Sequence, residues 1–415
     1  MPKSNIIAGI DMGSGKITGV IASHDYETQT VKILSGATIP CRGLKSGVVV
    51  DIKDTSNAVA QLLDQCERDA DVEVERVFLG VRGVHLKSSN GHGAYNIARA
   101  DKEITAEDVQ FVIENAKAVP IETDKEIVHV IPQSFSIDRQ KGVPNPEGME
   151  GSLLEVDVHI VSASTSHLSN LIKSVAKAGF QVEEPCYGLI PLGECVLTQE
   201  EKELGALLMD FGGETISIGI YLEGGIKFSK DLPYGCDLIT RDIAYGLHTS
   251  REAAREIKEK YGVTWPALMS ADDEIPVPSL DKRTSTGVKP DYLLEIVQPR
   301  VEELFDKIRV EIEKTRYADI PGVGVITGGG SLLKGMPELC GQALGLREVR
   351  QAGVQRDLVV ADEEFFHSQY STAVALAVYP SVRSDSASEP AAARGRNPIG
   401  RLTDFFKGLD IFGRD

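Results

Sequence analysis

The sequence predicts an α/β fold made of two similar halves, and three glycine-containing turns carry this prediction. In the first two, an apolar run ends in an aspartate, a glycine turn follows, and an apolar strand returns. In the third, a buried-strand pattern leads into three successive glycines. Such patterns indicate strands joined by tight turns. Because the aspartate pattern occurs twice, we expect an internal duplication whose two loops face one cleft.

The central hairpin spans residues 207–221, with Asp210 at the end of its apolar run and Gly212, Gly213, Glu214 and Thr215 in its turn. Glycines without a Cβ let backbone N–H groups surround an anion, and a carboxylate at the strand end can hold a metal-bound water. The pattern therefore predicts a phosphate with its Mg²⁺. The alternative is an ordinary hairpin, since Gly-Gly turns join many strands.

The second copy lies at the N-terminus. An apolar run over residues 6–10 ends in Asp11, the turn contains Gly13, Ser14, Gly15 and Lys16, and residues 17–21 return as a strand. Lys16 adds a cation that can reach phosphate oxygens, although a lysine beside glycine is also a common solvated turn residue.

The third glycine cluster follows a short strand pattern at residues 323–326 and consists of Gly328, Gly329 and Gly330. Successive glycines let a flat ring lie against the backbone, where a side chain would intrude. A hinge or a tight turn is the alternative.

With these elements in this order, the chain resembles the actin, sugar kinase and heat-shock chaperone superfamily, and within it the FtsA family of bacterial cell-division actins. The segments similar to FtsA signatures are residues 128–133, 145–148, 240–245 and 370–374, together with the tail. The resemblance implies an actin-like two-lobed ATPase fold of duplicated ribonuclease H-like halves, with an inserted subdomain 1C and a C-terminal amphipathic helix.

The resemblance also implies an ATP and Mg²⁺ site. Asp11 and Asp210 would hold Mg²⁺ through water, and Gly328, Gly329 and Gly330 would face the nucleoside. The phosphates would be bound by Gly13, Ser14, Gly15, Lys16, Gly212, Gly213 and Thr215. Lys258 matches a nucleoside-binding lysine of the family, but Arg255 occupies the position of its glutamate partner, and Glu214 stands where many relatives have a third glycine.

Glu184 is the candidate catalytic residue. In the relative MreB, a similar Glu-Glu-Pro segment precedes the helix that links the lobes and is implied in positioning the attacking water. The alternative is an acidic residue favoured at a helix N-terminus by the macrodipole.

The remaining elements follow from periodicity and caps. In the first lobe we expect strands at 31–39 and 77–81 and helices at 54–69 and 168–179. The insertion should contain strands near 84–88, 127–131 and 156–161 and one helix that Thr105 caps. In the second lobe we expect a strand at 226–232, surface strands and loops at 265–290, a strand near 358–360, and helices at 237–245, 250–261, 293–317 and 332–344. A last helix at 371–378 should belong to the first lobe.

The resemblance divides the chain into subdomains. Subdomain 1A takes residues 1–80, 161–193 and 361–383, and 1C takes residues 81–160. Subdomain 2A takes residues 194–226 and 298–360, and 2B takes residues 227–297. A flexible linker over 384–396, rich in Ser, Ala, Pro and Arg, leads to an amphipathic membrane-targeting helix at 397–415.

The amphipathic pattern of the tail predicts an interfacial membrane anchor, because the expected helix follows a linker and has no core to pack into. One face carries Ile399, Leu402, Phe405, Phe406, Leu409 and Phe412. Its charges nearly balance, so apolar burial should dominate its attraction to lipid. Docking on the chain's own body or in a partner groove is the alternative.

Composition limits the function classes. The net charge of −18 argues against nucleic-acid binding, because phosphate backbones are held by clustered cations. The six cysteines have no metal-type spacing, which fits reduced thiols in a cytosol. We expect neither a signal peptide nor a membrane-spanning segment.

The resemblance implies a cytoplasmic, peripheral protein of the inner membrane at the division site. It would bind Mg-ATP, polymerise, tether FtsZ filaments through the FtsZ C-terminal peptide at residues 227–297, and help recruit other division proteins. ATP would act as a conformational and polymerisation switch, with weak or absent hydrolysis. The alternatives are an ATP-dependent small-molecule kinase and a pilus-assembly binding module of the PilM type.

Overall fold

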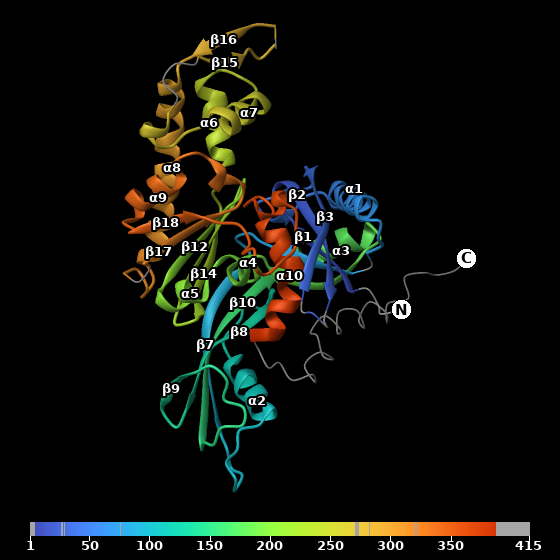
Figure 1. Ribbon diagram of the computed structural model, residues 1–415, viewed down its shortest axis with the longest axis vertical. Helices are drawn as coiled ribbons and strands as arrows, with labels where there is room; N and C mark the ends of the chain where they lie inside the picture. Colours follow the sequence, from blue (N-terminus) through green and yellow to red (C-terminus); the bar gives the residue numbers. More distant parts are fainter. Residues whose placement is uncertain are drawn as a thin grey trace, which may run out of the picture.

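The computed structural model describes residues 5–386 apart from 26, 27, 29, 75, 270–273, 282 and 320–321. Two five-stranded sheets lie side by side in the middle of an elongated molecule (Figure 1). A hairpin and helices extend from one end, and a four-stranded sheet with one helix extends from the other. The predicted anchor at 397–415 and residues 387–396 of the predicted linker lie outside the described residues, whereas residues 384–386 belong to the last helix.

The two central sheets have the same topology. In each, three antiparallel strands are followed by two parallel ones. The first runs β3 (Thr30–Cys41), β2 (Gly15–Asp25), β1 (Asn5–Asp11), β6 (Arg76–Val81) and β11 (Gln181–Tyr187). The second runs β14 (Gly225–Leu232), β13 (Ile216–Leu222), β12 (Ala206–Phe211), β17 (Val323–Thr327) and β18 (Glu348–Gln351). This repeat confirms the predicted two-lobed α/β fold.

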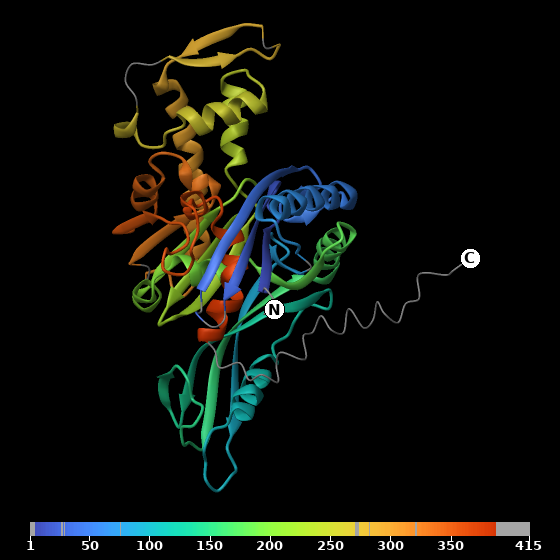
Figure 2. The same cartoon turned by 45° about the vertical axis from the view of Figure 1, so that its right-hand side comes forward.

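Helices cover both faces of the first sheet. Helices α1 (Ile52–Ala70) and α3 (Thr165–Lys177) pack together on one side, and Asp51 caps α1 by accepting a hydrogen bond from the Asp54 amide. Helix α10 (Ser371–Ser386) packs on α4 (Leu189–Val196) and β1, and both views place it between the lobes (Figure 2). The short helix α5 (Gln199–Leu204) then leads into β12.

The second lobe has a separate core, in which β12 and β13 pack against helices α6 (Asp237–Gly246) and α8 (Pro290–Glu313). Helix α7 (Arg251–Tyr261) begins where the Ser250 hydroxyl accepts from the Ala253 amide. The other elements of this lobe are β15 (Ile275–Pro278), β16 (Ser285–Val288), α9 (Met336–Leu344) and the 3₁₀ turns Pro266–Leu268 and Gly329–Leu332. The 3₁₀ turn Glu363–Phe366 packs in the first core through Phe365.

The inserted unit has its own core beneath a sheet ordered β7 (Lys87–Asn96), β10 (Leu153–Ser164), β8 (Lys125–Ile137) and β9 (Gln140–Val143). Its helix α2 (Ala106–Ala116) begins with a capping box between Thr105 and Asp108, and Thr105 is the predicted cap. A small hairpin, β4 (Leu44–Lys45) and β5 (Val48–Val49), lies in the first lobe.

The inserted unit is hydrogen-bonded to the edge strand β14 of the second lobe. Asn90 Nδ2 donates to the Lys227 carbonyl at 3.0 Å and Ser88 Oγ to the Ser229 carbonyl at 2.6 Å. The buried imidazole of His159 lies 2.8 Å from Asn90 Oδ1 and 2.9 Å from Ser229 Oγ. Side chains of the inserted unit therefore donate hydrogen bonds to the backbone carbonyls of alternate residues along this strand edge.

Three expected elements differ from the structure. The strand expected at 84–88 begins only at Lys87, because the chain turns where the Leu86 amide donates to the Gly83 carbonyl. Helix α9 begins at Met336 and not near Leu332, because Gly335 adopts a positive φ of 88°. Residues 358–360 form no strand; Val360 makes a single bridge to Lys32.

Within the described part of the chain, no helix is long and apolar enough to cross a bilayer. All six cysteines are free and buried.

Candidate functional site

Asp11 and Asp210 occupy equivalent places in the two sheets. Asp11 ends β1 opposite Thr18 of β2, and Asp210 lies near the end of β12 opposite Ser217 of β13. Each glycine turn begins two residues after its aspartate, at Gly13 and Gly212. The predicted duplication thus places both aspartates, with their turns, at the facing ends of the two hairpins.

The two turns lie against each other between the lobes. A Cβ built on Gly213 would lie 3.4 Å from the Ser14 carbonyl oxygen, and one on Gly212 would lie 3.2 Å from Arg82 Nη1. Gly213 is also next to the start of α6, where the Asp237 amide donates to its carbonyl at 2.8 Å. The sequence-predicted turns are therefore brought together.

A buried arginine joins the two aspartates. Arg82 Nη2 lies 2.8 Å from Asp11 Oδ1 and 3.2 Å from Asp210 Oδ2. The side chain of Arg82 is 8% exposed, against 17% for Asp11 and 5% for Asp210. Burial raises the pKa of Asp11, and the neighbouring guanidinium opposes this shift. Burial opposes the charge of Arg82, but the carboxylates of Asp11 and Asp210 outweigh it and raise the pKa of the guanidinium.

A third buried carboxylate, Asp231 at the end of β14, completes the group. It accepts hydrogen bonds from the Gly83 amide at 2.5 Å and from the Tyr187 hydroxyl at 2.7 Å. Burial raises the pKa of Asp231 as well, and these hydrogen bonds act against the rise. The group therefore carries more acidic than basic side chains.

Glu214 also joins the two lobes. Its carboxylate accepts from the Ser46 amide at 2.6 Å and from the Ser46 hydroxyl at 3.3 Å, and the neighbouring Gly47 amide donates to Ser14 Oγ at 3.3 Å. The departure from a third glycine at this position thus provides a contact to the first lobe.

The third glycine cluster packs on the same site. Gly328 has a φ of 80°, and a Cβ on it would lie 2.2 Å from Asp210 Oδ1. A Cβ on Gly330 would lie 2.3 Å from Cys236 Sγ, whereas one on Gly329 would meet nothing within 4 Å. Close packing therefore requires two of these glycines, and Gly329 lies on the open side.

Lys258 and Lys16 have different surroundings. The Lys258 amine donates to Thr240 Oγ1 at 2.9 Å and to the Cys236 carbonyl at 3.3 Å, which ties it to the start of α6 beside the Gly330 turn. Lys16 is exposed at the start of β2, as is Arg255 on α7.

Glu184 lies within strand β11, opposite Phe78 of β6, and β6 separates it from β1. Helix α4 begins only at Leu189, so the macrodipole account of this glutamate does not apply. Its catalytic role stays a prediction.

The donor set fits a hydrated divalent cation with phosphates. Carboxylates from both lobes converge beside two glycine turns, and the buried Thr327 hydroxyl, opposite Asp210, has no hydrogen-bond partner among the described residues. Water-bound Mg²⁺ typically takes one or two carboxylates and substrate phosphates. Asp11 and Asp210 would hold such an ion.

Comparison with known proteins identifies the family. The family described as "Cell division protein FtsA" matches residues 207–375, and "SHS2 domain inserted in FTSA" matches residues 83–162. The cell division protein FtsA of Pseudomonas aeruginosa is 34% identical over 375 residues, covering 90% of this chain and 89% of that protein. FtsA of Escherichia coli K12 is 30% identical over 383 residues, covering 90% of each.

The chain belongs to the FtsA family of cell-division proteins.

Solved structures agree with an actin-like fold for this FtsA-family chain. The PilM-PilN type IV pilus biogenesis complex has a chain with a TM-score of 0.64 at 18% identity, covering 91% of this chain and 98% of that one. MreB5 of Spiroplasma citri bound to ADP gives 0.55 at 9% identity, covering 93% and 98%.

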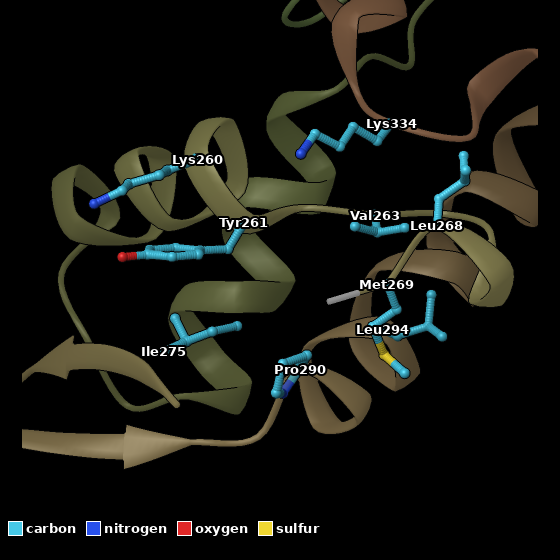
Figure 3. A pocket seen from close by; sticks show the side chains of 9 residues that line it. All are labelled: Lys260, Tyr261, Val263, Leu268, Met269, Ile275, Pro290, Leu294 and Lys334. Atoms are coloured by element: carbon cyan, nitrogen blue, oxygen red, sulfur yellow. The ribbon is translucent and has the colours of Figure 1, made fainter. Parts of the chain in front are cut away.

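A separate hollow of about 140 Å³ lies between α7 and α8 in the second lobe of this FtsA-family chain. Figure 3 shows its apolar lining from several elements, with Lys260 and Lys334 beside it. The Lys260 amine lies 5.0 Å from the centre of the Tyr261 ring. The lining residues are Lys260, Tyr261, Val263, Leu268, Met269, Ile275, Pro290, Leu294 and Lys334.

Sequence reasoning missed Arg82, Asp231 and the contact of Glu214 with Ser46. The available signal was a charged residue directly after, or near the end of, an apolar strand: Arg82 follows residues 77–81, and Asp231 lies in residues 226–232. The pattern did not reveal their partners.

Proposed function

We propose that this chain is an ATP-binding, polymerising cell-division protein that holds FtsZ filaments at the cytoplasmic face of the cell membrane. The proposal rests on one observation, the meeting of the Asp11 and Asp210 turns from two lobes of the same topology. A ligand with several phosphates can contact both turns at once. Binding it would favour one arrangement of the lobes, which is how a nucleotide can control self-association.

Each part of the nucleotide has proposed partners. Bound Mg²⁺ would neutralise phosphate charge near Asp11 and Asp210. The turn amides of Gly13, Gly15 and Gly213, with Lys16, would hold the phosphates. Gly212, whose amide donates to the Thr215 carbonyl at 3.0 Å, would contribute by having no side chain there, and the open side at Gly329 would face the nucleoside. Glu184 is the proposed positioning residue for water. Hydrolysis is proposed to be weak or absent, with the nucleotide acting mainly as a switch.

The FtsZ C-terminal peptide is the proposed ligand of the hollow between α7 and α8. Its apolar lining and the flanking Lys260 and Lys334 suit a short segment with apolar and acidic side chains. Other division proteins and further copies of this chain are also proposed partners.

The tail at 397–415 is proposed to anchor the chain to lipid through Leu402, Phe405 and Phe406. Membership of the FtsA family favours this role over a small-molecule kinase or a pilus-assembly module of the same fold. Neither alternative needs an anchor helix.

Electron microscopy on lipid monolayers with ATP tests the proposal. We expect filaments from the full chain and from Arg401→Ala/Lys407→Ala, since confinement to a surface raises the effective concentration. We expect none from a chain ending at Arg396 or from Phe405→Ala/Phe406→Ala, because burying each large apolar side chain is worth about 1.5–3 kcal/mol.

Two outcomes would contradict it. Monomers alone from the full chain at high coverage would argue against polymerisation. Loss of binding in the charge variant, with binding kept in the phenylalanine variant, would rule out insertion as the anchoring force.

A further inference from the structure

The position of Arg82 is unusual for a site that is proposed to bind a cation. Its Nη2 lies within 3.2 Å of carboxylate oxygens from both lobes, on Asp11 and Asp210. These are the two side chains proposed to hold hydrated Mg²⁺. A guanidinium in contact with both carboxylates therefore competes with that ion for the same negative charge.

The surroundings keep Arg82 in this place. Asp231 from β14, the Tyr187 hydroxyl and the second glycine turn border the group, and Thr372 of α10 lies 3.5 Å from Asp210 Oδ2. Lys16 is the further cation that acts on Asp11 electrostatically. The side chain of Arg82 is only 8% exposed, so its ion pairs with Asp11 and Asp210 are largely shielded from water. Removing one partner of such a buried ion pair costs much free energy.

Arg82 also lies in the segment that connects the first lobe to the inserted unit. It follows β6 directly, and the next residue, Gly83, donates its amide to Asp231 of the second lobe. The chain then enters β7 at Lys87, whose neighbours Ser88 and Asn90 bind β14. A movement of Arg82 would therefore act on the first link between the inserted unit and the second lobe.

We propose that Arg82 is an internal counter-ion that joins the two lobes in the nucleotide-free protein and is displaced from the aspartate pair by Mg²⁺ arriving with a nucleoside triphosphate. This rests on the proposed nucleotide site. Displacement exchanges one cation for another between Asp11 and Asp210, so the buried carboxylates stay neutralised in both states. It also loosens the segment that begins the inserted unit, which couples nucleotide binding to the orientation of that unit.

The test measures binding of Mn²⁺ alone to the nucleotide-free full chain by electron paramagnetic resonance, and of Mg-ATP by calorimetry. Arg82→Gln keeps hydrogen-bonding capacity but removes the charge, so we expect it to bind Mn²⁺ more tightly by about tenfold or more. Arg82→Lys keeps a cation at the site and should resemble the wild type. Arg76→Gln is the matched control, since Arg76 is 63% exposed and pairs with Glu183 on the surface.

The outcomes separate this inference from the proposed function. Wild-type protein that binds no Mg-ATP would overturn the nucleotide site itself. If the wild-type protein binds Mg-ATP but Arg82→Gln binds Mn²⁺ no more tightly than the wild type does, the counter-ion role alone is overturned. Weaker Mg-ATP binding by Arg82→Gln, with no gain for Mn²⁺, would instead make Arg82 a phosphate ligand and would also overturn it.

A measurement on the wild type covers the case in which Arg82→Gln does not fold. We expect saturating Mg-ATP to lower hydrogen-exchange protection in residues 81–86, and ATP with EDTA to leave it unchanged. Equal or higher protection with Mg-ATP would overturn the displacement.

Discussion

At the level of single residues, the site is governed by buried charge. Asp11, Asp210 and Asp231 are withdrawn from water together, which is costly unless cations or hydrogen-bond donors face them. Arg82 and Tyr187 supply this compensation. In the proposed exchange, a divalent cation with bound phosphate would take over the part of this compensation that Arg82 supplies to Asp11 and Asp210.

Replacing Gly213 with valine tests the contact between the turns. A Cβ there would meet the Ser14 carbonyl oxygen at 3.4 Å and the Asp237 carboxyl carbon at 3.5 Å, which are ordinary contacts that the fold can accept. The rest of the side chain would enter the space proposed for phosphate. We expect Mg-ATP affinity to fall by about tenfold or more, equivalent to at least about 1.4 kcal/mol.

Isothermal titration on the folded variant measures this. Gly341→Val is the matched control, because a Cβ on Gly341 has contacts of 3.5 and 3.6 Å in helix α9, away from the turns. Unchanged affinity in Gly213→Val would show that the cleft is assigned wrongly.

His159 should make stability depend on pH. Burial lowers its pKa from 6.5 to about 4, so between these values the unfolded chain binds a proton that the folded chain does not. Stability is therefore unaffected above this window and falls as the pH falls through it, by up to about 3 kcal/mol. We expect His159→Gln to reduce this dependence.

Thermal unfolding of the wild type and the variant, at a series of pH values that spans this window, measures the effect. Because His85 also has a lowered pKa, of about 4, the informative quantity is the difference in stability between wild type and variant at each pH. His92→Gln is the control, since His92 is 57% exposed at its side chain. Identical pH profiles for the wild type and His159→Gln would contradict the prediction.

At the level of helices and strands, the second lobe presents a surface made by several segments. The hollow between α7 and α8 receives side chains from the 3₁₀ turn after Trp265, from β15 and from Lys334 before α9. Its apolar lining and two flanking amines come from elements far apart in the sequence. The periodicity of α7 or α8 alone does not reveal this surface.

Reversing the charge of the hollow should weaken the proposed binding of the FtsZ C-terminal peptide. A peptide that is disordered when free loses entropy on docking, so we expect weak, micromolar affinity for the wild type. For Lys260→Glu/Lys334→Glu we expect a decrease of about tenfold or more, because the like charges would repel an acidic segment.

Fluorescence anisotropy with the labelled peptide measures both affinities. Lys53→Glu/Arg68→Glu, at two exposed positions of α1 in the other lobe, controls for the same change in net charge. Absence of binding by the wild type at high micromolar protein would argue against the partner, and equal binding by the double variant would argue against this hollow.

Across the molecule as a whole, the described residues form three hydrophobic cores. The first lies in the first lobe and extends onto one face of the second sheet through Leu208 and Val325. The second lies on the other face of that sheet, and the third lies in the inserted unit around Val112, Leu154 and Val158. The turns at Asp11 and Asp210 adjoin the first two cores. A ligand held between these turns should therefore stabilise the lobes more than the inserted unit.

Hydrogen exchange with and without Mg-ATP measures this difference. At a ligand concentration of about 100 times Kd, binding adds about 2.7 kcal/mol to the stability of the units that hold the ligand. We expect higher protection in β1 and β12 and unchanged protection in α2. An equal gain in α2 would contradict the prediction, because it would show that the three cores unfold together.

Local sequence patterns were enough to predict most of the elements and the duplication. Apolar periodicity and caps are local, so Thr105 and Ser250 marked the starts of α2 and α7, and both aspartate hairpins were found where they lie. The partners of Arg82 and Glu214 became visible only in the folded chain, because these contacts join residues 128 and 168 positions apart. The same holds for β7, a largely polar strand without apolar alternation, which is held in place by its pairing with β10. Local sequence patterns do not predict such pairings, because the burial and the hydrogen bonds of a residue depend on which distant segments pack next to it in the folded chain.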